Sequence, residues 1–141
     1  MAQLFGQSGA KVVIGDINPA GVETANLIKS EGGEAIFVQT DVRKAKGVEN
    51  LVATAVEIYG GLHCAFNNAG VLPPTVTLVE MDESTFDKTL AADLKGVFLS
   101  MKYEIAHMRT ASSVCRKQLH WSMSVKESGS TRLPLVWLKR Q

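Results

Sequence analysis

The sequence contains few of the residues that mark secreted, metal-binding or membrane proteins. Only two of its 141 residues are cysteine, Cys64 and Cys115, too few and too far apart for a disulfide framework or a thiolate metal cluster. No stretch approaches the roughly 20 consecutive apolar residues that a helix needs to span a bilayer. The N-terminus also lacks a basic segment followed by an apolar core, so no signal peptide is apparent. These absences favour a cytoplasmic protein with no metal and no membrane partner.

The net charge of +1 conceals a sharp asymmetry along the chain. Residues 1–108 carry 8 Lys/Arg and 13 Asp/Glu, whereas residues 109–141 carry 7 Lys/Arg and a single acid. This change predicts a boundary near Met108, with one domain over residues 1–108 and a divergent, poorly ordered basic tail over residues 109–141. A basic tail could contact nucleic acid, but the domain is acidic and no nucleic-acid motif is present. We therefore expect no nucleic-acid partner.

Strand-like and helix-like segments alternate through the first 108 residues. Short apolar runs typical of buried strands occupy residues 11–16, 34–40 and 62–67. Segments with helical periodicity precede, separate and follow them, at residues 1–9, 19–33, 45–61 and 82–108. This alternation predicts the α/β class, with a doubly wound parallel sheet of the Rossmann type.

The carboxyl ends of the three predicted strands carry residues suited to a nucleotide. Ligands of open parallel sheets bind at these ends. Asp16 can accept hydrogen bonds from both ribose hydroxyls of an adenosine, or can simply begin a turn. Asp41 can bind an adenine amino group or cap the next helix. In the third strand end, Ala69 and Gly70 allow a ring or a ribose to approach the backbone closely, and Asn67 can tie neighbouring strand ends together, although alone this tetrapeptide could be a turn.

Together these segments resemble the short-chain dehydrogenase/reductase family. The resemblance covers about residues 2–108 and is carried, in order, by "GAKVVIGDIN", "TDV", "FNNAG" and "DLKGVFLSMKYE". It implies NAD as the cofactor and hydride transfer between its nicotinamide and a small alcohol or carbonyl as the family activity. The cofactor-binding residues that it implies are Asp16, Ile17, Asp41, Val42, Asn67, Ala69 and Gly70.

The sequence departs from the family pattern at its beginning. Family members place a strand and a glycine-rich turn, T-G-x-x-x-G-x-G, before the helix that corresponds to residues 2–9 here, and that turn holds the pyrophosphate. The missing strand is the central one in the family's sheet, so we expect a partial Rossmann sheet without its first central strand. Two strand edges would lose their partner, at about 1–3 kcal/mol for each buried backbone group left unpaired.

The tail offers two interpretations. One is an unfolded extension, as expected for a shifted reading frame or an aberrant splice product. The other is that "LPLVWL" (133–138) enters the empty strand position, although Pro134 argues against a central strand because it has no N–H for the ladder.

The catalytic residues of the family are not found. The family requires a tyrosine and a lysine four residues later, but the residues four after Tyr59 and Tyr103 are His63 and His107. The family's helix-borne asparagine corresponds to Asp93, and Ser113 could correspond to its serine. We therefore predict no catalytic residue and no normal turnover.

Three functional hypotheses remain open. The chain is an NAD-dependent oxidoreductase by inheritance, or an inactive dinucleotide-binding or interaction subunit, or a product of a damaged reading frame. An interaction role would use residues 93–108, whose family counterpart forms an oligomer interface. A homo- or hetero-oligomer, the latter with an intact paralogue, is the partner implied, and the sequence does not identify the substrate.

Overall fold

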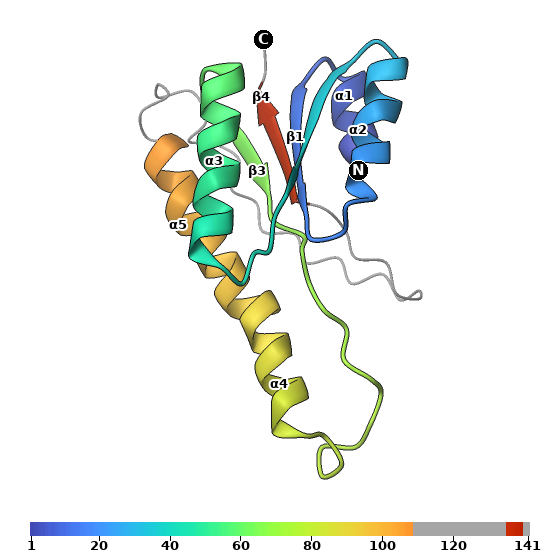
Figure 1. Ribbon diagram of the computed structural model, residues 1–141, viewed down its shortest axis with the longest axis vertical. Coiled ribbons are helices and arrows are strands. Elements are labelled where there is room, and N and C mark those ends of the chain that lie inside the picture. The colour runs from blue at the N-terminus through green and yellow to red at the C-terminus, as the bar shows by residue number, and fades with distance from the viewer. Residues whose placement is uncertain (109–134, 140–141) are drawn as a thin grey trace.

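The computed structural model describes residues 1–108 and the backbone of one further strand, Leu135–Lys139 (Figure 1). The elements follow the predicted alternation of helices and strands. They are α1 (Ala2–Gln7), β1 (Lys11–Asp16), α2 (Gly21–Ser30), β2 (Glu34–Gln39), α3 (Ala45–Tyr59), β3 (Cys64–Phe66), α4 (Glu83–Leu90), a π-helical segment η1 (Ala91–Gly96), α5 (Val97–Met108) and β4 (Leu135–Lys139). The prediction of a poorly ordered tail falls largely outside the described residues.

The sheet has the strand order β2-β1-β4-β3. The predicted parallel pairing is confirmed for β1 and β2, which align from Lys11 opposite Glu34 to Asp16 opposite Gln39. Strands β1 and β3 are not direct neighbours, because β4 lies between them and pairs antiparallel with both. Since both run opposite to β4, β1 and β3 are parallel to each other.

Strand β4 occupies the central position that the family pattern left without a strand. Val136 pairs with Ile14 of β1 and with Phe66 of β3, and Trp137 pairs with Val13 and Ala65. The expectation that Pro134 would keep this segment out of the sheet is wrong. The strand begins at Leu135, immediately after the proline, so every residue of β4 keeps its own N–H for the ladder.

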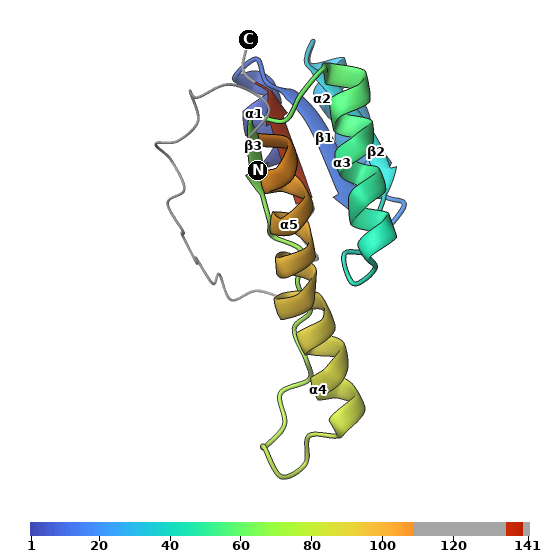
Figure 2. The same cartoon turned by 90° about the vertical axis from the view of Figure 1, so that its left-hand side faces the viewer.

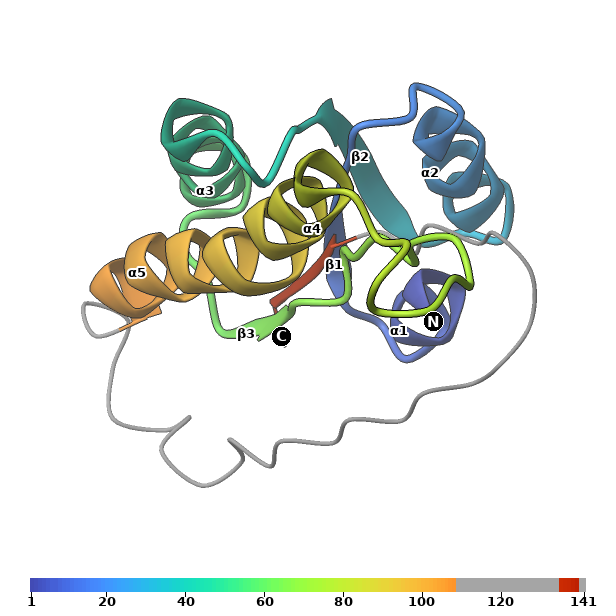
Figure 3. The same cartoon turned by 90° about the horizontal axis from the view of Figure 1, so that it is seen from below.

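Helices cover both faces of the sheet. Figures 2 and 3 show α1 and α2 on one side and α3 and α5 on the other. Alternate residues of β1 supply the two cores, since Val12 and Ile14 pack beneath α1 and α2 while Val13 packs beneath α3 and α5. This burial on both faces explains why the strand is continuously apolar.

The predicted helix at residues 82–108 is continuous but not uniform. It begins at Asp82, whose side chain caps α4 by accepting from the amide of Thr85 at 2.9 Å. It passes through the π-helical turn η1 and continues as α5. At the end of that turn Gly96 approaches Val42, and a Cβ on Gly96 would lie 2.9 Å from Val42 Cγ2. Figure 2 shows α4 projecting beyond the sheet on the side from which α5 returns.

Within the described part of the chain, no helix is long and apolar enough to cross a membrane. The same residues contain no group of three or more histidine, cysteine, aspartate or glutamate side chains that could hold a metal ion.

Candidate functional site

The carboxyl ends of β1, β2 and β3 meet at one edge of the sheet. The ends of β1 and β2 are joined directly, because the amide of Thr40 donates to the carbonyl of Asp16 at 2.8 Å. The register through β4 brings Phe66 level with Ile14, so Asn67 follows at the level of Gly15. With one strand between them, the ends of β1 and β3 lie roughly 10 Å apart. The structure therefore gathers the three predicted groups of residues at one edge.

Asp16 and Ile17 end the first strand in an exposed turn. The carboxylate of Asp16 accepts from the amide of Asn18 at 2.8 Å through Oδ1, and the Asn18 side chain in turn accepts from the amide of Ala20 at 3.0 Å. The carbonyl of Ile17 accepts from the Gln39 side chain at 3.1 Å, which ties this turn to the end of β2. Asp16 thus has the turn-forming role that the sequence left open, and a carboxylate with two oxygens retains capacity to accept further hydrogen bonds.

Asp41 is held by Arg43, a residue that the sequence did not single out. Two side-chain hydrogen bonds join them, Nε to Oδ1 at 2.8 Å and Nη2 to Oδ2 at 2.9 Å, and the Arg43 amide adds a third to Oδ1 at 3.1 Å. The side-chain hydrogen bond from Arg43 is the main reason why the pKa of Asp41 lies below its usual value. Helix α3 begins after Lys44 and has no side-chain cap, so the alternative role of Asp41 as its cap is wrong.

Val42 and Ala69 contribute to a small pocket between two strand ends and the long helix. Its empty volume is about 150 Å³. The residues that line it come from the ends of β2 and β3, from η1 and from α5, and are Val42, Asn67, Ala69, Gly96, Val97 and Ser100. Three of the predicted cofactor residues therefore share one pocket, at the place where Gly96 lets the helix approach.

Asn67 binds a helix, whereas the sequence predicted that it would tie strand ends together. Its Nδ2 donates to Oε2 of Glu104 in α5 at 2.8 Å. Glu104 is 3% exposed, and its burial raises its pKa to about 7, with the bond from Asn67 acting in the opposite direction. Sequence reasoning missed Glu104, although one signal was available. It follows Ser100 by four residues, so two polar residues share a helix face that also buries Leu99.

Gly70 and Asp93 meet at the start of the loop that follows β3. Oδ1 of Asp93 accepts from the amide of Val71 at 2.7 Å, and a Cβ on Gly70 would lie 3.3 Å from the same oxygen. Asp93 replaces the family's asparagine, and in this structure its carboxylate fixes the loop after the strand end. An asparagine side-chain oxygen could accept the same bond.

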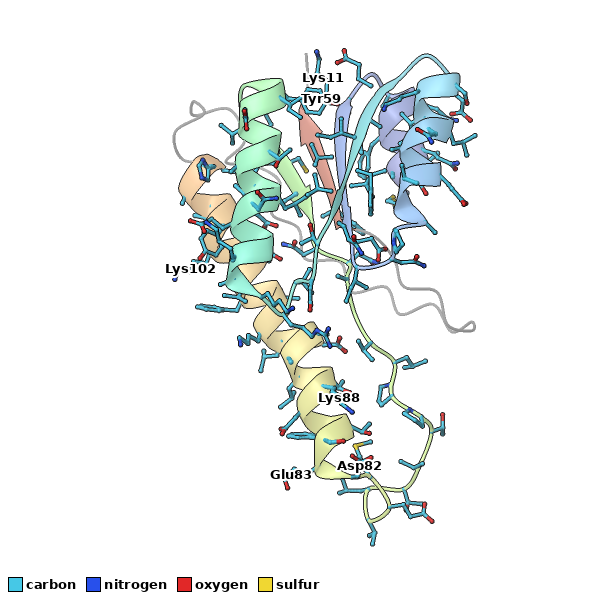
Figure 4. All side chains as sticks on the ribbon, in the orientation of Figure 1. Lys11, Tyr59, Asp82, Glu83, Lys88 and Lys102 are labelled. Carbon is cyan, nitrogen blue, oxygen red and sulfur yellow. The ribbon has the colours of Figure 1, made fainter. Side chains whose placement is uncertain are left out.

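Neither tyrosine forms the tyrosine–lysine couple of the family. Tyr59 lies beside Lys11, whose Nζ is 5.6 Å from the ring centre, at the edge of the sheet opposite the site (Figure 4). Burial raises the pKa of Tyr59, which makes its phenol a weaker acid. Lys102 lies over Tyr103, the next residue in sequence, at 5.7 Å. Ser113 lies outside the described residues, so its predicted role stays a prediction.

Comparisons with known proteins agree with this architecture. A family model described as enoyl-(acyl carrier protein) reductase matches residues 1–126. An uncharacterised oxidoreductase of Thermotoga maritima is 46% identical over 109 residues, which are 77% of this chain and 42% of that protein. The chain thus spans less than half the length of this curated relative.

Solved structures give the same result. A short-chain dehydrogenase/reductase from Burkholderia xenovorans superposes with a TM-score of 0.73 at 31% identity, over 78% of this chain and 44% of that one. An NADH-dependent reductase responsible for alginate metabolism superposes with a TM-score of 0.70 at 26% identity, over 78% and 46%. The sequence match, the sheet and the arrangement of the strand ends show that this chain belongs to the short-chain dehydrogenase/reductase family of oxidoreductases.

Proposed function

We propose that this chain holds the adenosine end of NAD at the edge formed by β1, β2 and β3. The observation that carries the proposal is the junction of Asp16 and Thr40, which sets two acidic strand ends, Asp16 and Asp41, side by side. A carboxylate at the end of β1 can accept both ribose hydroxyls and repels a 2′-phosphate, which favours NAD over NADP. When bound, NAD supplies a hydride acceptor, and the family reaction transfers hydride between it and a small alcohol or carbonyl.

This chain should bind the cofactor without turning it over. The glycine-rich turn that would hold the pyrophosphate precedes the family's first helix and is not in this sequence. The sequence also has no tyrosine followed four residues later by lysine, so no lysine lowers a phenol pKa for proton transfer. We therefore place the chain among dinucleotide-binding relatives that are inactive alone.

A thermal melt with and without NAD tests the binding. A ligand that binds only the folded state raises the unfolding free energy by about 2.7 kcal/mol at a hundred times its Kd. We expect millimolar NAD to raise the melting midpoint, NADP to raise it less, and Asp16→Ala to remove that difference. Asp87→Asn, an exposed acid on α4, is the matched control and should behave as wild type.

Two results would contradict these proposals separately. An unchanged midpoint in NAD at every concentration means that no adenosine site exists. Steady formation of NADH with a panel of small alcohols, surviving Asp93→Ala and Ser113→Ala, means that the chain has a catalytic couple other than the family's.

A second candidate function is that of an interaction subunit, and the outer face of the long helix supports it. A shallow groove there is lined by Asp87, Leu90, Ala91, Leu94, Lys95 and Phe98. Leu94 is 65% exposed and Phe98 58%, and Ile105 continues the apolar stripe at 47%. The cooperating surface would be the same face of a second copy or of an intact paralogue.

Light scattering after size-exclusion chromatography tests this pairing. We expect the wild-type chain to elute as a dimer, and Phe98→Asp combined with Ile105→Asp to elute as a monomer with an unchanged melting transition. Co-expression with a full-length family member tests the mixed pair. A wild-type chain that stays monomeric and captures no such member would argue against an interaction role.

A further inference from the structure

The junction between the end of β3 and α5 contains a buried polar cluster with unfilled hydrogen-bonding capacity. It consists of Asn67, Ser100 and Glu104. Ser100 is 1% exposed and Glu104 3%. One bond joins its members, from Asn67 Nδ2 to Glu104 Oε2 at 2.8 Å. Among the described residues, three buried atoms of the cluster have no partner: Asn67 Oδ1, Ser100 Oγ and Glu104 Oε1.

The three unpartnered atoms indicate what the cluster lacks. Asn67 Oδ1 can only accept, and an ionised Glu104 Oε1 can only accept as well. The Ser100 hydroxyl is one donor for two acceptors, so an ionised cluster leaves at least one buried oxygen without a hydrogen bond. A proton on Glu104 removes the deficit, because the acid then both donates and accepts.

No charged neighbour compensates an ionised Glu104. The causes of its raised pKa are burial and, in the opposite sense, Asn67. The helix packed against α5 is α3, and its nearest charges, Lys46 and Glu49, form an ion pair with each other at 2.9 Å. On η1, Asp93 is bound by the amide of Val71. Tyr103 and His107 share the helix with Glu104, and none of these groups is among the causes of its shift.

We propose that Glu104 is a positioning residue that holds Asn67 as a neutral carboxylic acid, and that loss of its proton loosens the segment Asn67–Val71. The cofactor-lining residues Ala69 and Gly70 lie in that segment, so the cluster would couple the shape of the strand end to proton concentration. The coupling is a property of the fold and holds whether or not NAD binds.

The direction of the pH effect follows from linkage. A carboxyl group with a raised folded-state pKa contributes stability that is complete below its unfolded pKa of 4.5, and that is lost as the pH rises through about 7. Between pH 5.5 and 8.5 the unfolding equilibrium constant of the wild-type chain should therefore rise on the order of tenfold from this group alone. The usual behaviour of a surface carboxylate has the opposite sign.

Three substitutions at one position separate positioning from burial. Glu104→Gln keeps a donor and an acceptor without titrating, so it should remove the pH dependence and keep the amides of residues 67–71 protected from hydrogen exchange at pH 8.5. Glu104→Leu also removes the titration but cannot bind Asn67, so it should lose that protection at every pH. Glu57→Gln, an exposed change on α3, should keep the wild-type profile.

The measurements are denaturant unfolding across pH and amide exchange corrected for the intrinsic rate at each pH. If wild type and Glu104→Gln have parallel pH profiles, Glu104 is ionised throughout and the proposal is wrong. If Glu104→Leu protects residues 67–71 as well as Glu104→Gln does, burial alone matters and Glu104 does not position Asn67. Neither readout depends on NAD.

Discussion

Replacing Val136 by proline should destroy most of the stability of this domain. Val136 is the residue of β4 that pairs with both Ile14 and Phe66, and Ile14 is fully buried. Proline removes an N–H from the middle of the ladder and leaves a carbonyl of β1 or β3 without its donor, at about 1–3 kcal/mol. Its ring is also not accommodated in a central strand. We expect a loss of roughly 3 kcal/mol or more, a large part of the ~5–15 kcal/mol that holds typical domains folded.

The measurement is a denaturant or thermal melt followed by circular dichroism, together with amide exchange in β1 and β3. Thr75→Pro is the matched control, since it introduces the same residue into the exposed loop between β3 and α4 and should change the midpoint little. Faster exchange at Val12, Val13 and Ala65 in Val136→Pro would localise the damage to the strands flanking β4. Equal midpoints for Val136→Pro and wild type would mean that β4 does not complete the sheet in solution.

The sequence predicted the parts of the fold that depend on local pattern. The run "KVVIGD" is apolar because both faces of β1 are covered, and the observed strand has the predicted limits, Lys11–Asp16. Strand β4 could not be predicted in the same way. Its place depends on the edges that β1 and β3 present, a demand of the tertiary structure that the local signal of Pro134 concealed.

The site was predicted to the same extent and for the same reason. Asp16 and Asp41 follow strands, so their meeting at one edge follows from parallel pairing alone. The partners Arg43 and Glu104 were missed, because a hydrogen bond between a loop and a helix 37 residues away leaves no periodic trace in the sequence. The π-helical turn was missed for a similar reason, since residues 82–108 have an ordinary helical pattern.

Truncating Leu51 to alanine is the second change for which we expect a large effect. Leu51 of α3 is fully buried in the core beneath α3 and α5. Its side chain covers Gly15, the residue before Asp16, and a Cβ on Gly15 would lie 2.5 Å from Leu51 Cδ2. Leu51 therefore fills the space that glycine leaves on β1. Its loss should open a cavity beside the candidate site and lower the unfolding free energy by about 2–5 kcal/mol.

A second substitution tests whether this contact, and not burial in general, is responsible. Gly15→Ala should destabilise the wild-type chain, because its methyl group meets Leu51, but should stabilise Leu51→Ala, because the same methyl group fills part of the cavity. The sign of its effect therefore reverses between the two backgrounds, which a double-mutant cycle of denaturant melts measures directly. Leu72→Ala is the control, since Leu72 is 87% exposed and its truncation should cost less than about 0.5 kcal/mol. Additive effects of Gly15→Ala and Leu51→Ala would mean that α3 does not rest on Gly15, and that the end of β1 is positioned by its strand neighbours alone.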